Sequence, residues 1–207
     1  MENENLPPKL ISLKQFKFED FEIKNFIGRG AFSEAMEFLR IADKKIIVGK
    51  IPNELISDND FIREAKLHHK SANNSVFIVP FFGVIMDPKV LLLEFFKNGA
   101  LSEALEKDFE FFDDDEKSRY PVIKRLSFAL DMVNAVNHLH SLNIVHRDLA
   151  IRNLLLSDDE SYCLLSDFSL ARVVGDELDK GSKPLVSSTS APEVFSSRSR
   201  ISMKLDV

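Results

Sequence analysis

Short apolar runs separated by polar turns fill the first half of the chain, and this pattern is typical of strands. The runs are Ile23–Ile27, Ala35–Ile41, Ile46–Ile51, Val76–Met86 and Val90–Phe96. Between the third and fourth runs, residues 57–60 supply N-cap side chains directly ahead of Phe61, Ile62 and Ala65. Such residues mark the start of a helix. The first half is therefore expected to form a sheet with one helix.

A longer helical pattern follows Pro121. Apolar residues recur there at steps of three and four, the spacing of an amphipathic helix. These residues are Leu126, Ala129, Leu130, Val133, Val136 and Leu139. Further on, Ile144–Val145, Leu154–Leu156 and Cys163–Leu165 indicate short strands. A strand-rich part thus precedes a helix-led part, which predicts an α+β fold with two lobes.

The change of character lies near Phe96–Gly99 and suggests three parts of the chain. We expect an N-terminal arm at residues 1–20, with the first 15 residues loose. An N-terminal lobe at residues 21–96 should hold an antiparallel sheet and one helix. A helical C-terminal lobe should occupy residues 97–207.

Composition narrows the class of protein. The 207 residues are 44% hydrophobic and 29% charged with a net charge of −6, which suits one large domain or two small lobes. The acidic balance gives no reason to expect nucleic-acid or anionic-membrane binding. Cys163 is the single cysteine and cannot form an internal disulfide. The N-terminus lacks the apolar region of a signal peptide, and no apolar stretch reaches the roughly 20 residues of a membrane helix. We expect a cytoplasmic protein without a membrane segment.

Two groups in the first half suggest phosphate chemistry. Gly28 and Gly30 lie between expected strands, where glycines let backbone N–H groups approach a polyphosphate, although a tight hairpin explains them equally. The dinucleotide fingerprint is excluded, because Ser33 replaces its third glycine and a strand follows. Taken separately, Lys50 and Glu64 are each typical of a charged side chain exposed to solvent. Together, the glutamate could hold a lysine aimed at phosphates.

Three polar residues in the second half suggest metal chemistry. Asp167 follows an apolar strand, and Asp148 and Asn153 lie five residues apart. Carboxylate and amide oxygens are the ligands that magnesium prefers, so Asn153 and Asp167 form a candidate pair and Asp148 remains free to orient a hydroxyl. Capping of a turn by Asp148 and Asn153 is the alternative. The histidines at 68, 69, 138 and 140 lack the partners of a zinc site.

In this order, the residues resemble the signature set of the eukaryotic protein kinases. The matching segments are the glycine-rich residues 28–35, Ile47–Lys50, Glu64, the hinge Leu93–Phe96, His146–Asn153, Asp167–Ser169 and Ala191–Glu193. The resemblance covers about residues 21–207 and points to the tyrosine-kinase or tyrosine-kinase-like group. It implies the two-lobe kinase fold.

The resemblance also implies roles. Asp148 would accept or orient the proton of the substrate hydroxyl, with Arg152 beside it in the catalytic group. Lys50, held by Glu64, would position the α- and β-phosphates of ATP. The nucleotide-binding residues would be Ile27, Gly28, Gly30, Ser33, Ala35, Lys50, Glu94, Phe96, Asn153 and Asp167, and Mg²⁺ would be held by Asn153 and Asp167. An arginine before the catalytic aspartate, here Arg147, commonly receives an activating phosphate in the family.

Departures from the family pattern leave alternatives open. Ser169 replaces a glycine, which costs about 1 kcal/mol if the backbone there is unusual. Met203–Val207 resembles the approach to the central helix of the C-terminal lobe, with Asp206 as the residue that anchors the catalytic loop. The C-terminal lobe then reads as incomplete, open to chaperone capture or self-association. Ala150 replaces the lysine usual in serine/threonine kinases, yet Pro184–Ser190 lacks the tyrosine-kinase basic residue and tryptophan.

Three functions therefore stay in view. The first is an ATP- and magnesium-dependent protein kinase that acts on tyrosine, serine or threonine of a protein substrate. The second is a pseudokinase that binds nucleotide and works as a scaffold, and the third is an incomplete kinase fragment without stable activity. A metal-dependent hydrolase built on Asp148 and Asp167 fails to explain Lys50 and Glu64.

Overall fold

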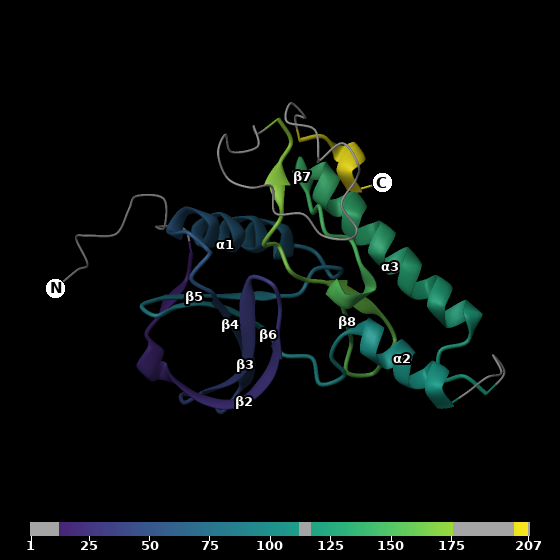
Figure 1. Ribbon diagram of the computed structural model, residues 1–207, viewed down its shortest axis with the longest axis horizontal. Helices are drawn as coiled ribbons and strands as arrows, with labels where there is room; N and C mark the ends of the chain where they lie inside the picture. Colours follow the sequence, from purple (N-terminus) through teal and green to yellow (C-terminus); the bar gives the residue numbers. More distant parts are fainter. Residues whose placement is uncertain (1–12, 112–116, 176–200, 207) are drawn as a thin grey trace. The chain divides into compact units, whose positions relative to one another are not determined.

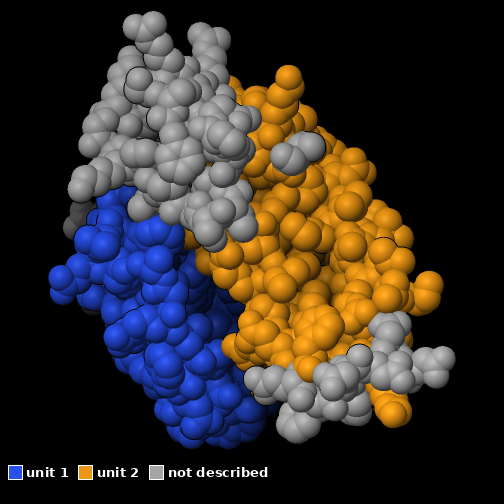
Figure 2. Space-filling view, turned by 45° about the vertical axis from the view of Figure 1, so that its right-hand side comes forward, with its two compact units in different colours: residues 1–70, 80–95 blue, residues 71–79, 96–207 orange. Residues whose placement is uncertain are grey.

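The computed structural model describes residues 13–111, 117–175 and 201–206. The chain forms two compact units, shown in different colours in Figure 2. Unit 1 consists of residues 1–70 and 80–95, and unit 2 consists of residues 71–79 and 96–207. Unit 1 holds a sheet and most of one helix, whereas helices lead unit 2, which confirms the expected α+β class.

Unit 1 is built on a six-stranded, strongly curved sheet (Figure 1). Its strands are β1 Gln15–Phe16, β2 Phe21–Arg29, β3 Ser33–Arg40, β4 Ile46–Pro52, β5 Phe81–Met86 and β6 Lys89–Glu94. They follow the order β1-β5-β6-β4-β3-β2. Neighbours pair antiparallel except β1, which runs parallel to β5. The expectation of an antiparallel sheet is therefore correct for β2 to β6 and wrong for the β1 edge.

Strand β1 also corrects the expectation of a loose arm. Gln15 pairs with Val84, Leu13 is buried, and the carbonyl of Lys14 accepts the Val84 N–H at 2.9 Å. This close approach requires a glycine on β5, because a Cβ at Gly83 (φ +155°) would lie 2.4 Å from that carbonyl oxygen. Gln15 and Phe16 thus form an edge strand of the sheet, and Leu13 is buried beside it.

Phenylalanines fill the core of unit 1. Phe38 is fully buried and meets Phe21 edge to face at 6.0 Å between ring centroids. Its ring also lies against β4 at Gly49, where a Cβ would come within 2.4 Å of a ring carbon. The glycine beside Lys50 therefore lets a core aromatic pack flat on the strand that carries the lysine.

Helix α1 spans Asp58–Ala72 and begins where the sequence predicts. The Ser57 hydroxyl accepts the backbone N–H of Asp60 at 3.2 Å, which satisfies one of the open N–H groups at the helix start. Phe61 and Ala65, one turn apart, are buried. This cap and apolar face orient the helix that carries Glu64.

Unit 2 contains helices α2 Leu101–Phe111 and α3 Val122–Ser141 (Figure 1). Strands β8 Leu154–Leu156 and β9 Cys163–Leu165 form one hairpin, and β7 Ile144–Val145 pairs with β10 Arg172–Val173. Short 3-10 helices cover Phe18–Asp20 in unit 1 and Ile151–Asn153 and Met203–Asp206 in unit 2. The three short strands expected in this half are confirmed, whereas α2 was not expected. Among the described residues, no helix is long and apolar enough to cross a membrane.

Helix α3 exists as expected, but most of the predicted apolar face points to solvent. Leu126 and Leu130 are each 59% exposed and Val133 is 61% exposed. The buried positions are Phe128, Ala135 and Leu139. The buried side of α3 packs against the β8–β9 hairpin. Asp131 accepts the backbone N–H of Cys163 at 3.0 Å, and the Cys163 thiol lies 3.6 Å from the Phe128 carbonyl oxygen.

Candidate active site

The hairpin of β2 and β3 carries the glycine-rich residues. Its turn is closed by a bond from the Gly30 N–H to the Ser33 carbonyl at 2.8 Å, and Gly28 pairs with Ala35. A Cβ at Gly28 would have no atom within 4 Å, so the strand presents open space there. The structure thus places five of the proposed nucleotide-binding residues on one hairpin: Ile27, Gly28, Gly30, Ser33 and Ala35.

Lys50 and Glu64 meet in unit 1. The Lys50 ammonium lies 2.5 Å from Glu64 Oε1, and the side chains are only 12% and 10% exposed. Lys50 is fixed by the ladder, where it pairs with Ala35 on β3 and Leu91 on β6, while Glu64 comes from α1. With little water to screen it, this pair is a strong charge-assisted hydrogen bond. The same small cavity of unit 1 contains both groups.

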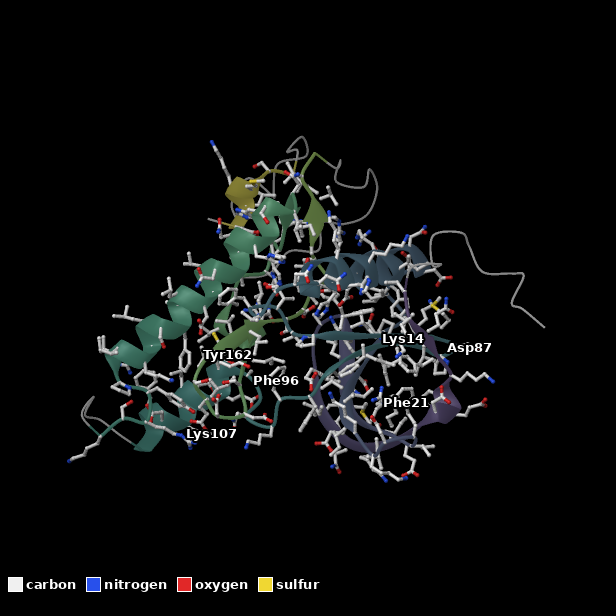
Figure 3. The ribbon with its side chains drawn as sticks, turned by 180° about the vertical axis from the view of Figure 1, so that it is seen from behind. Lys14, Phe21, Asp87, Phe96, Lys107 and Tyr162 are labelled. Atoms are coloured by element: carbon white, nitrogen blue, oxygen red, sulfur yellow. The ribbon has the colours of Figure 1, made fainter. Side chains whose placement is uncertain are left out.

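The expected hinge residues Glu94 and Phe96 take part in backbone hydrogen bonds within the protein. Glu94 ends β6, donates its N–H to the Pro80 carbonyl at 3.0 Å and places its carboxylate 2.9 Å from the Lys45 ammonium. Phe96 belongs to unit 2, on the stretch after β6 (Figure 3), and its carbonyl accepts the Gly99 N–H at 3.1 Å. The Glu94 N–H is therefore already engaged within the protein, and the adenine contacts expected of Glu94 and Phe96 stay a prediction.

In unit 2, two neighbours hold the carboxylate of Asp148. Arg152 donates to Oδ1 at 2.5 Å, and the Asn153 amide donates to Oδ2 at 2.8 Å. The same amide also donates to the Asp148 backbone carbonyl at 2.7 Å. Asp148 is buried, with 8% of its surface exposed. Because an ionised carboxylate offers about four acceptor sites, these bonds orient Asp148 without exhausting it.

The β8–β9 hairpin brings Asn153 near Asp167. Asn153 directly precedes β8, and its backbone carbonyl accepts the N–H of Ser166, the neighbour of Asp167, at 2.8 Å. The Asn153 amide nitrogen faces Asp148, so its side-chain oxygen is not used in that contact. The described residues contain no group of three acidic, histidine or cysteine side chains able to form a metal cage. An amide oxygen and one carboxylate suit a divalent cation that takes its other ligands from phosphates and water.

Backbone strain at the metal-binding tripeptide lies at its aspartate. Asp167 has φ 61°, and its Oδ1 accepts the Ser169 N–H at 3.2 Å. Ser169 does not have a positive φ, so its backbone avoids the left-handed conformation that would strain a serine there. Phe168 between them is fully buried and meets the His146 ring edge to face at 5.1 Å.

Asp206 anchors the catalytic loop, as the resemblance implies. Its carboxylate accepts the backbone N–H of His146 at 2.8 Å and of Arg147 at 2.7 Å, and it lies 3.1 Å from His140 Nε2. His146 itself is fully buried, and burial lowers the pKa of its ring. The neutral ring holds the Ser166 carbonyl through Nε2 at 2.9 Å. The supporting roles of His140 and His146 were not predicted, because the sequence pattern does not show which backbone atoms they reach.

Arg147 occupies an unexpected setting. Its side chain is buried and donates to the Leu170 carbonyl at 3.3 Å, and its own φ is 69°. The expectation that it receives a phosphate stays a prediction. The segment Ala191–Glu193, which carries part of the resemblance, lies outside the described residues.

Comparisons with known proteins agree with this geometry. Residues 21–207 match the family model described as protein tyrosine and serine/threonine kinase. Similar proteins include the dual specificity protein kinase pyk3 of Dictyostelium discoideum, 31% identical over 80% of this chain and 12% of the relative. Others are protein-tyrosine kinase 6 of Mus musculus, 29% identical over 91% of this chain and 40% of the relative, and receptor-interacting serine/threonine-protein kinase 2 of Bos taurus, 30% identical over 71% and 27%.

The chain thus spans less than half the length of these curated relatives. The family model nevertheless covers most of the chain, including every described residue discussed above from β2 onward. The chain therefore belongs to the protein tyrosine and serine/threonine kinase family.

Proposed function

We propose that this protein transfers the γ-phosphate of ATP to a hydroxyl group of a protein substrate. Family membership implies the use of ATP and a divalent metal. The observation that carries the proposal is the double hold on Asp148 by Arg152 and Asn153. A carboxylate fixed in this way can orient the acceptor hydroxyl and take its proton, which is the role of the general base in this chemistry.

The unit 1 residues serve the nucleotide. Lys50 is the cation for the α- and β-phosphates, and Glu64 keeps it extended, so that little side-chain freedom is lost when ATP binds. The hairpin residues around Gly28 and Gly30 offer backbone N–H groups to the phosphates. Glu94 and Phe96 face adenine with their backbones. Positioning and charge neutralisation therefore supply most of the catalysis.

The metal assigned to unit 2 is Mg²⁺, held by Asn153 and Asp167. When bound, it neutralises charge on the phosphate oxygens. Asn153 has a second task, because its amide nitrogen donates to Asp148 while its side-chain oxygen would be the atom that holds the metal. One residue thus links the position of the metal to the position of the catalytic carboxylate.

The acceptor is tyrosine or serine/threonine. The relatives include both classes, so the substrate and pathway are matters for experiment. Phosphoamino-acid analysis of a generic protein acceptor distinguishes the two outcomes. We further propose that residues 21–96 act as the N-terminal lobe, that residues 97–207 belong to the C-terminal lobe, and that the protein works in the cytoplasm.

Two substitutions test the proposal. Lys50→Met removes the phosphate cation and its ion pair with Glu64, whereas Asp148→Asn leaves the hydroxyl unoriented. Asp148→Asn should lower turnover about 10²–10⁴-fold, the usual worth of a general base. Lys50→Met should raise KM for ATP and lower turnover as well. The measurement is transfer of labelled γ-phosphate to a generic protein substrate.

Exposed residues of the same type provide controls. Lys24→Met lies on the edge strand β2, and Asp58→Asn removes a carboxylate that is 79% exposed at the start of α1. Both should retain wild-type transfer. Transfer by the Lys50 or Asp148 variant at the wild-type rate would contradict the proposal. ATP binding without transfer by the wild-type chain would instead support a nucleotide-binding scaffold.

A further inference from the structure

Asn53 joins the tip of the glycine-rich turn to the linker that leads into α1. Its backbone N–H donates to the Phe32 carbonyl at 2.9 Å, and its side-chain Nδ2 donates to the Ala31 carbonyl at 2.9 Å. On the linker side, its Oδ1 accepts the Leu55 N–H at 3.1 Å and its own carbonyl accepts the Ile56 N–H at 3.1 Å. One side chain and its backbone thus hold two short segments together.

These bonds fix the direction of the N–H groups at the tip. A trans peptide is planar, so the carbonyl of one residue and the N–H of the next point in opposite directions. With the carbonyls of Ala31 and Phe32 both turned toward Asn53, the N–H groups of Phe32 and Ser33 point away from it. Consecutive N–H groups that face one side are the arrangement by which a turn binds phosphate oxygens.

Within the hairpin, the turn is closed by the bond from the Gly30 N–H to the Ser33 carbonyl at 2.8 Å and by the ion pair of Arg29 and Glu34 at 2.6 Å. A Cβ at Gly28 would meet no atom within 4 Å, and one at Gly30 would meet only the Ser33 carbonyl at 3.7 Å. A turn that contains glycines has backbone freedom that must be lost when the turn is ordered. Two bonds from Asn53 to the tip therefore remove freedom that a bound nucleotide would otherwise have to remove.

The cavity of unit 1 ties the same tip to the charged pair. Phe32 from the turn and Ile56 from the linker line the cavity that also contains Lys50 and Glu64. The segment fixed by Asn53 thus borders the group that we assign to the phosphates. The linker continues directly into α1, which carries Glu64.

We propose that Asn53 is a positioning residue that latches the glycine-rich turn and keeps its N–H groups ready for the phosphates of ATP. The inference rests on the kinase function proposed above. Asn53 acts through the backbone of the turn and does not itself bind the nucleotide. Because a bound nucleotide orders the turn by itself, loss of the latch should raise KM for ATP more than it lowers kcat.

Asn53→Asp isolates the latch. The aspartate keeps the oxygen that accepts the Leu55 N–H and all backbone bonds, but it lacks the donor to Ala31. Asn53→Ala removes the donor without adding charge. Asn59→Asp is the matched control, because it adds the same charge at an exposed position in the first turn of α1.

Two measurements on the full chain test the inference. Protection against amide hydrogen exchange at the Gly30 N–H, which donates to the Ser33 carbonyl, and at the backbone N–H of position 53, which donates to the Phe32 carbonyl, should be lower in both Asn53 variants than in the wild type and the control. KM for ATP should rise about 2- to 12-fold in both, which corresponds to one hydrogen bond. The melting temperature of each variant is recorded to show that it is folded, and kcat should change less than KM.

Unchanged exchange in the Asn53 variants would show that the tip is not held by this residue and would overturn the inference. Faster exchange with an unchanged or lower KM would overturn it as well, because the latch would then not prepare the turn for ATP. If KM for ATP rose as much in Asn59→Asp as in Asn53→Asp, the added negative charge would explain the rise. That result would overturn the role of the latch. Failure of the wild-type chain to bind ATP would instead overturn the kinase function itself, a result visible before any variant is made.

Discussion

Asp108, near the end of α2, is a buried carboxylate surrounded by donors. It accepts bonds from the Ser118 hydroxyl and from the backbone N–H groups of Arg119, at 2.8 Å, and Tyr120, at 3.4 Å. Burial alone would raise the pKa of Asp108, but the hydrogen bonds outweigh it and hold the pKa below its ordinary value. Asp108 thus secures the stretch that leads into α3 from the end of α2.

We predict that Asp108→Asn lowers the free energy of unfolding by about 1–3 kcal/mol at pH 7, because the amide turns a donor toward other donors. Since the pKa is depressed in the folded state, the stabilisation is fully present above the unfolded pKa of about 3.9 and is lost as the pH falls through the folded pKa. The difference from wild type should therefore shrink below about pH 4. Urea denaturation at several pH values measures it, with Glu106→Gln on the exposed side of α2 as the control.

Cys163 offers a probe of opening in unit 2. Burial, with the nearby Asp131 carboxylate, raises the pKa of its thiol to about 12. The thiolate is the reactive form, so the folded protein should react slowly with a disulfide reagent at pH 8. Because Cys163 is the single cysteine, the absorbance of the coloured thiolate that the reagent releases measures the reaction of this one residue. We predict labelling that accelerates with urea in step with unfolding, and complete labelling within seconds in buffer would contradict the buried setting.

At the scale of elements, α3 shows how a sequence pattern can mislead. The apolar steps from Leu126 onward predict the helix correctly but indicate the wrong buried face. The described structure buries Phe128, Ala135 and Leu139, and leaves exposed a stripe of large apolar residues: Val122, Ile123, Leu126, Leu130 and Val133. The helix is apolar on two sides, so periodicity alone could not choose between them. The expectation that this part of the chain associates with itself or with chaperones stays a prediction.

Paired substitutions distinguish the two faces of α3. Phe128→Ala should cost about 3–5 kcal/mol of unfolding free energy, because it empties a fully packed position. Leu130→Ala, two residues along, should change stability by no more than about 0.5 kcal/mol, as is usual at exposed positions. Urea midpoints of the two variants measure the difference. Equal losses would show that Leu130 is covered in solution.

Other elements differ in how well the sequence could reveal them. The hairpin strands and the start of α1 were predictable, because alternation and an N-cap serine are local signals. Strand β1 was not, since two residues have no periodicity and the strand exists only because Gly83 admits it. In the site, Lys50 and Glu64 could be paired from their motif and opposite charges. Asn53 could not be singled out, because its role depends on carbonyls of a turn that lies up to 22 residues earlier in the sequence.

For the whole molecule, the assigned nucleotide-binding residues come from both units. Lys50 and the glycine-rich hairpin belong to unit 1, and Asn153 and Asp167 belong to unit 2. The second pair consists of oxygen donors, which attract phosphates only through a cation. Binding of ATP should therefore depend on magnesium to a degree set by Asn153 and Asp167.

We predict that ATP with magnesium raises the melting temperature of the chain and that ATP with a chelator raises it much less. A ligand at about 100 times its Kd stabilises the folded state by about 2.7 kcal/mol. For a chain of this size, each kcal/mol corresponds to about 2–4 °C. Asp167→Asn should lose the extra shift from magnesium and keep the small shift from ATP alone, while Asp58→Asn should behave as wild type. An equal shift with and without magnesium would show that the metal pair is misassigned, because the phosphates would then be held by unit 1 alone.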